Sequence, residues 1–112
     1  EMISQGPDDQ TRTVGSWEGR EIYRSPDGQI QMFEHWARDA KKVATPMHVH
    51  EKSHVWATVL SGKVRVQTET EEHALGPHDS IHFPPETSHS TTPLTRTTRV
   101  VLVLSPAEDA WA

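Results

Sequence analysis

The alternation of apolar and polar residues predicts short β-strands along most of the chain. In residues 63–68, two valines, Val64 and Val66, alternate with the polar Arg65 and Gln67. Successive side chains of a strand point to opposite faces, so this pattern is typical of a strand with one buried face. By similar patterns, further extended segments are predicted over 17–23, 29–36, 54–60, 80–83 and 99–104. No segment carries a long apolar stripe at helical spacing, and only a short helix in 106–112 is compatible with the pattern.

Glycine and proline separate these segments at intervals of roughly 8–12 residues, the spacing of an all-β sandwich or barrel. Ser25-Pro26-Asp27-Gly28 predicts a turn between two extended segments. Ser61-Gly62 lies between two strand-like segments, and such a short connection predicts a hairpin. Residues 1–16 are polar and have no periodicity. We therefore expect a flexible N-terminal lead-in over 1–16, followed by a single domain over 17–112.

Composition and charge exclude several classes of function. The chain has 112 residues, which suits one domain with a modest core. Its net charge is −5 and its 11 lysines and arginines are scattered, so we expect no nucleic-acid partner. No apolar stretch is long enough to cross a bilayer, so we expect no membrane partner. The absence of cysteine excludes disulfides and thiol catalysis, and no secretory signal is visible, so we expect a cytoplasmic protein.

The eight histidines are the most informative residues of the chain. His48, His50 and His54 directly precede an apolar run, and His89 follows a proline-containing segment. Side chains two positions apart on an extended strand share a face, so His48 and His50 can direct two imidazoles at one point. Neutral imidazole is a common ligand for transition metals. The pattern therefore predicts a mononuclear metal site.

The order of these features resembles the cupin superfamily. Its first motif has His-x-His, a short spacer, a carboxylate and then a glycine turn, and the segment from His48 to Gly62 is similar to it. Its second motif, Pro-x-Gly-x-x-His, is similar to Pro84-Pro85-Glu86-Thr87-Ser88-His89. The segment 75–83 is also similar to the stretch that leads into the second motif. The resemblance covers roughly residues 29–104.

The resemblance implies an all-β fold, the cupin-type double-stranded β-helix or jelly-roll barrel. It also implies a small single-domain cupin with an all-histidine metal site, in which His48, His50, His54 and His89 bind one divalent transition metal (Mn, Fe, Zn, Ni or Cu). A small-molecule substrate and a homodimer are further implications.

The chain departs from the family pattern at three places. His54 replaces the carboxylate of the first motif. The family's fourth ligand usually stands seven residues before the glycine, where this chain has Val55, and a β-bulge between His54 and Gly62 would restore the direction of His54. Glu86 and His78 stand at positions where the family has glycine, which predicts altered turns.

Four neutral ligands would leave the full positive charge of a divalent ion available, which makes the ion a strong Lewis acid. Without a carboxylate ligand, another residue must move protons. The candidates on predicted strands are Tyr23, Glu34, His35 and His82. The pattern leaves open which face of 29–36 is buried. An apolar cup with one polar anchor is predicted from Met32, Phe33, Trp36, Trp56 and Arg65.

These residues also have purely structural interpretations. A His-x-His pair is often a solvent-facing stripe, and the tryptophans are often core residues. His35, His73 and His78 are typical of surface positions, and His82 of an outer-face or core position. Arg65 is typical of a solvated cross-strand partner.

Three functions follow from these patterns. The first is a metal-dependent enzyme that uses the ion as a Lewis acid for isomerisation, elimination or cyclisation of a small oxygenated compound. The second is a dioxygenase, which needs a redox-active metal. The third is a non-catalytic ligand-binding cupin.

Overall fold

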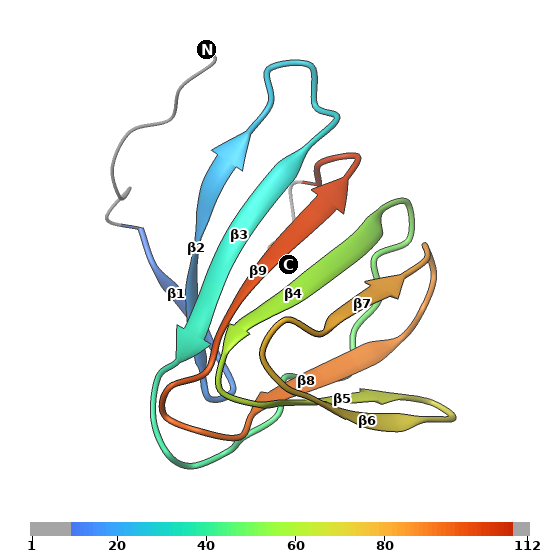
Figure 1. Ribbon diagram of the computed structural model, residues 1–112. Coiled ribbons are helices and arrows are strands. Elements are labelled where there is room, and N and C mark those ends of the chain that lie inside the picture. The colour runs from blue at the N-terminus through green and yellow to red at the C-terminus, as the bar shows by residue number, and fades with distance from the viewer. Residues whose placement is uncertain (1–9, 109–112) are drawn as a thin grey trace.

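The computed structural model describes residues 10–108, and this part of the chain forms nine strands and no helix (Figure 1). The strands are β1 (Arg12–Val14), β2 (Trp17–Arg24), β3 (Gln31–Ala37), β4 (His54–Ser61), β5 (Val64–Thr68), β6 (Glu72–Leu75), β7 (Ser80–Phe83), β8 (His89–Pro93) and β9 (Arg99–Ser105). No helix among these residues is long and apolar enough to cross a membrane.

Two antiparallel sheets form the molecule. The larger sheet has six strands in the order β1-β2-β3-β9-β4-β7, and the smaller has three in the order β6-β5-β8 (Figure 1). Neighbours in the sheets are mostly distant in sequence, as for β3 and β9 or β5 and β8. This connectivity confirms the predicted all-β class and is consistent with the jelly-roll architecture of cupins.

The core lies between the two sheets, and alternation supplies it most clearly on β3 and β5. Val64 and Val66 of β5 are buried, as their spacing predicts, while Arg65 and Gln67 are partly exposed. On β3, Gln31, Phe33 and His35 face inward and the residues between them face outward. The buried apolar cluster contains Trp17, Phe33, Val55, Val59, Val64, Val66, Phe83, Val100 and Leu104.

The predicted turn at Ser25–Gly28 is confirmed. It joins the antiparallel strands β2 and β3, and the backbone N–H of Gly28 donates to the carbonyl of Ser25 at 3.0 Å. Gly28 has a φ of 73°, a left-handed conformation that glycine adopts without a steric penalty.

The predicted hairpin at Ser61-Gly62 is wrong. β4 pairs with β9 and β7, whereas β5 pairs with β6 and β8, so the chain passes here from one sheet to the other. Gly62 has a φ of 77°, and a Cβ on it would lie 2.5 Å from the Cα of Thr98. Glycine is therefore needed for the close backbone approach at this crossing and not for a hairpin.

The expected flexible lead-in is wrong for its described part. Residues 12–14 form β1, which pairs with β2 at the edge of the larger sheet. Ser16 is fully buried, where its hydroxyl donates to Asp39 at 2.8 Å and its backbone N–H donates to the carbonyl of Val43 at 2.8 Å. Polar residues order this segment by hydrogen bonding, which an apolar periodicity does not reveal. Residues 1–9 lie outside the described residues, as does most of the possible helix over 106–112, whose described part is not helical.

Candidate metal centre

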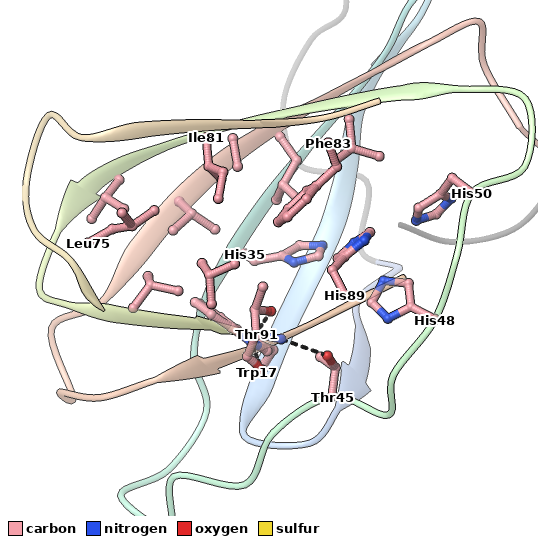
Figure 2. A pocket seen from close by; sticks show the side chains of 17 residues that line it. Trp17, His35, Thr45, His48, His50, Leu75, Ile81, Phe83, His89 and Thr91 are labelled. Atoms are coloured by element: carbon pink, nitrogen blue, oxygen red, sulfur yellow. Dashed lines mark hydrogen bonds between the residues drawn. The ribbon is translucent and has the colours of Figure 1, made fainter. Parts of the chain in front are cut away.

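A single β-bridge joins the two histidine segments. His48 and His89 form an isolated antiparallel pair, in which each backbone N–H donates to the other residue's carbonyl at 2.9 Å. His50 lies two residues beyond His48, and all three rings converge at one end of the interior (Figure 2). One ring nitrogen from each residue lies within 4.8 Å of those of the other two. The predicted convergence of His48, His50 and His89 is therefore present in the structure.

Each ring of this histidine triad is held through Nδ1 by an oxygen atom. The contacts are His48 to the carbonyl of Pro46 (2.9 Å), His89 to the carbonyl of Thr87 (2.9 Å) and His50 to the carboxylate Oε2 of Glu108 (2.7 Å). Carbonyl and carboxylate oxygens only accept hydrogen bonds, so Nδ1 carries the proton in the neutral ring. The lone pair of each imidazole is then on Nε2, the atom that remains for a metal.

The chemistry of these nitrogens fits a divalent transition metal. Within residues 10–108, the buried Nε2 of His50 has no hydrogen-bond partner, and such an atom is costly unless something binds it. Burial lowers the pKa of His89 to about 4, despite the opposing hydrogen bond to Thr87. Burial also lowers the pKa of His48, an effect that its bond to Pro46 opposes. Rings that resist protonation keep the neutral form that metals require. Three imidazole ligands leave coordination positions open.

The triad closes one end of an apolar cavity of about 40 Å³, which has room for only a few water molecules. In Figure 2 the three rings lie at one end of this space, and Leu75 and Ile81 lie at the other. The indole N–H of Trp17 donates to the hydroxyl of Thr91 at 3.1 Å at the cavity wall. The residues that line the cavity are Trp17, His35, Thr45, His48, His50, Val55, Ala57, Val59, Val64, Val66, Leu75, Ile81, Phe83, His89, Thr91, Val100 and Leu102.

His35 is a fourth histidine of this cavity, outside the triad. Its ring points from β3 toward the triad (Figure 2). His35 is buried, so the prediction of a surface position is wrong. Burial, with a contribution from His48, lowers the pKa of His35 to about 4. Gly19 pairs with His35 across β2 and β3, and a Cβ on Gly19 would lie 2.2 Å from the ring Cδ2. The glycine therefore makes room for the imidazole.

His54 does not join the triad, and its prediction as a fourth ligand is wrong. It is exposed on the outer face of β4, where its Nδ1 lies 2.8 Å from Nε2 of His82. The expected bulge between His54 and Gly62 is present, with its register shift between Val59 and Ser61, but it does not turn His54 inward. Residues 54–59 keep strict alternation, so Val55 faces inward and lines the cavity in the place of a ligand.

Three of the predicted proton-transfer residues lie away from the cavity. Glu34 faces outward on β3, where Arg20 binds it at 3.3 Å and Arg99 forms a second ion pair. Burial alone would raise the pKa of Glu34, but the hydrogen bonds and charges of these arginines hold it below its usual value. Tyr23 is partly exposed on β2 and is not among the lining residues. His82, the other candidate, is exposed and stacks on Trp56.

The predicted substrate cup is wrong, because none of its five residues lines the cavity. Phe33 faces inward but is fully buried in the core, and Met32 and Trp36 occupy the opposite face of β3. Trp56 is 52% exposed on the outer face of β4. Arg65 lies on the outward face of β5, as its structural interpretation predicts.

Two residues of the site have no motif that marks them. Glu108 reaches His50 from 58 positions away in the chain. Gly19 is a glycine inside a predicted strand, and such a position often marks a close approach. That signal was present in the sequence, whereas none was present for Glu108.

Comparisons with known proteins agree with the fold. A family model described as "Cupin domain" matches residues 35–104. KdgF from Halomonas sp. is 21% identical, with a TM-score of 0.76 over 89% of this chain and 88% of that one. An RmlC-like cupin from Shewanella frigidimarina NCIMB 400 is 20% identical, with a TM-score of 0.79 over 97% and 94%. The DMSP lyase DddQ from Ruegeria pomeroyi DSS-3 is 14% identical, with a TM-score of 0.75 over 91% and 58%. No curated protein sequence matches the chain.

Proposed function

Because the chain belongs to the cupin domain family, we propose that it is a metal-dependent enzyme acting on a small oxygenated molecule. The observation that carries this proposal is the triad itself. Three imidazoles with protonated Nδ1 atoms present Nε2 to the end of an apolar cavity that holds another histidine, His35. A divalent ion held by Nε2 of His48, His50 and His89 would supply Lewis-acid chemistry to a substrate oxygen.

The protein residues around the triad suit proton transfer during isomerisation, elimination or cyclisation. We assign the role of proton carrier to His35, since it is the lining residue outside the triad with a titratable side chain. With a pKa of about 4 the ring is neutral near pH 7 and a weak base, so it accepts only a proton that the bound substrate makes acidic. The protonated ring is a strong acid, so it readily returns that proton to another atom of the same substrate.

The shape and polarity of the cavity restrict the substrate. Its volume of about 40 Å³ admits only a small reacting group, so the rest of a larger substrate would lie outside the cavity. Among the described lining residues there is no lysine, arginine or carboxylate. We therefore propose that the end of the substrate that enters is uncharged, with a hydroxyl or carbonyl oxygen directed at the triad. KdgF and the lyase DddQ are similar to this chain in fold. That similarity supports the fold alone and does not identify a substrate.

The test is elemental analysis of protein purified without chelators and without a nickel column. We expect about one equivalent of a divalent transition metal in the wild type and a trace in the His48→Ala/His50→Ala double variant. Equal metal in the two proteins would reject the site. Assays with small hydroxy and carbonyl compounds then test the chemistry, with His35→Gln as the inactive control. Oxygen consumption that accompanies turnover would favour a dioxygenase instead of Lewis-acid chemistry.

We also propose a homodimer and a cytoplasmic location. The outer face of β4 supports the first, since Trp56 and Leu60 are 52% and 46% exposed there beside the edge strand β7. Exposed apolar groups next to a sheet edge favour association. Light scattering with size-exclusion chromatography measures the mass of the particle, and a monomer at micromolar concentration would contradict the dimer.

A further inference from the structure

His50 differs from the other two histidines of the triad in how its ring is held. His48 and His89 each use a backbone carbonyl two residues earlier in the chain. The corresponding carbonyl for His50 belongs to His48, and it already accepts the backbone N–H of His89. His50 instead donates to Glu108 at 2.7 Å, and its side chain is only 5% exposed. A buried ring of the triad therefore relies on a distant, charged acceptor.

The backbone of Glu108 is fixed on both sides of its Cα. Its N–H donates to Oε1 of Gln31 at 3.0 Å, and its carbonyl accepts from Arg24 at 2.7 Å. Gln31 is itself buried and donates to Glu21 at 2.8 Å. These contacts tie residue 108 to β2 and β3, so the carboxylate meets His50 from a fixed position.

The two preceding residues are fixed as well. The hydroxyl of Ser53, which is fully buried, donates to the carbonyl of Pro106 at 2.6 Å. The N–H of Ala107 donates to the carbonyl of Gly28 at 2.9 Å. Residues 106–108 thus form a strap between the β2–β3 turn and the segment that carries His50. An incidental ion pair at the surface would not have its backbone held by so many hydrogen bonds.

We propose that Glu108 is a positioning residue that fixes the tautomer of His50 and strengthens it as a metal ligand. The effect of Glu108 on metal binding rests on the proposed function. The effect of Glu108 on the His50 tautomer does not depend on a metal. An anionic acceptor on Nδ1–H raises the electron density at Nε2 and adds one negative charge to an otherwise neutral ligand set. Loss of such an outer partner typically weakens metal binding by about 10–100-fold.

The experiment compares Glu108→Ala, Glu108→Gln and a matched control, Glu51→Gln. Glu51 is exposed and adjacent to His50 in sequence, so its replacement removes the same charge without the contact. Co²⁺ affinity is measured by competition titration, and the Co²⁺ absorption spectrum reports the geometry of the ligands. The ¹⁵N spectrum of the metal-free protein reports which nitrogen of His50 carries the proton.

We expect Glu108→Ala to weaken Co²⁺ binding by about 10–100-fold, to alter the Co²⁺ spectrum and to leave the His50 tautomer mixed. Glu108→Gln should lose less affinity, because its amide oxygen still accepts from Nδ1 but carries no charge. Glu51→Gln should match the wild type. Wild-type affinity and an unchanged tautomer in Glu108→Ala would overturn the proposal.

Failure of the metal site itself would give a different result. The wild type would then bind Co²⁺ no better than the His48→Ala/His50→Ala variant, which rejects the proposed function. The ¹⁵N spectrum would still decide whether Glu108 sets the tautomer of His50. If Glu108→Ala does not fold, the milder Glu108→Gln variant provides both measurements, and wild-type values in that variant would overturn a role for the charge.

Discussion

His48 and His89 exchange both of their backbone hydrogen bonds, each 2.9 Å long, and this places their ring centroids 4.3 Å apart. The ring of His89 also stacks on Phe83, with centroids 4.0 Å apart and an interplanar angle of 5°. Backbone pairing and ring stacking therefore hold these two side chains without any metal. A site arranged in this way loses little conformational entropy when an ion binds.

Metal removal should lower the melting temperature of the wild-type protein. An ion that binds the native state alone stabilises it by mass action, by about 2.7 kcal/mol at a concentration one hundred times the Kd. Thermal melts before and after chelation and dialysis measure this difference. The His48→Ala/His50→Ala variant should melt at the same temperature in both conditions, and a wild type that behaves like it would contradict a bound ion.

The His54→Ala variant should retain its metal. His54 faces outward and contacts His82, so its loss removes no nitrogen from the triad. Elemental analysis after gel filtration should give the wild-type metal content for His54→Ala and a large loss for His89→Ala. Should His54→Ala lose the metal as His89→Ala does, the outer face of β4 would have to reach the ion by a rearrangement.

Much of the fold follows from residue periodicity. Val64 and Val66 face inward on β5 as their spacing predicts, because one face of that segment is apolar and the other polar. Segment 29–36 has apolar residues on both faces, with Met32 and Trp36 on one and Phe33 on the other. Its inward face could not be chosen from the pattern, and so the substrate cup was predicted from the wrong side chains.

The site could be predicted only where its geometry is local or follows a motif. His48 and His50 share a face by their spacing, and the resemblance to cupins adds His89. The position of Glu108 depends on how the chain end packs against β2 and β3, which no local pattern encodes. The direction of His54 depends on the register of residues 54–59 against β9, which the spacing to Gly62 does not encode even with the bulge between them.

Gly19→Ala should displace His35 and reduce activity. The added Cβ would lie 2.2 Å from Cδ2 of that ring and 2.9 Å from the carbonyl of Glu34, so the ring or the strand must move. Overpacking of this kind costs roughly 1–3 kcal/mol. Denaturant unfolding measures the loss. The control is Gly76→Ala, whose Cβ would have only an ordinary 3.8 Å contact, and equal stability of the two variants would contradict the prediction.

The metal-free protein should lose stability as the pH falls from about 6.5 toward 4. His35 and His89 have folded-state pKa values of about 4, below the ordinary 6.5 of the unfolded chain. Between these values the unfolded state binds more protons, so acid favours unfolding, by up to about 1.4 kcal/mol per pH unit for each histidine. Urea unfolding at pH 7.5, 6 and 5 measures the slope.

The His35→Gln variant provides the control for this pH dependence. Its unfolding free energy should fall less steeply over the same range, because one of the histidines with a lowered pKa is gone. Measurements stop at pH 5 so that Glu34, whose pKa is held low by arginines, stays ionised. A wild-type stability that is flat between pH 7.5 and 5 would show that these rings are not protected from protons.

Glu86→Gly should be tolerated and should raise the unfolding free energy by up to about 1 kcal/mol. Glu86 stands at the glycine position of the second motif, and its φ of 69° shows that the turn keeps the left-handed backbone that favours glycine. Relief of this strain, about 1–2 kcal/mol, exceeds the entropy cost of a glycine, about 0.5–1 kcal/mol.

Glu51→Gly replaces the same residue type at a position without positive φ and should therefore lose stability. Urea unfolding of the two metal-free variants tests the difference in sign. A loss in both would mean that the entropy cost of glycine at position 86 exceeds the strain that its left-handed backbone imposes on glutamate.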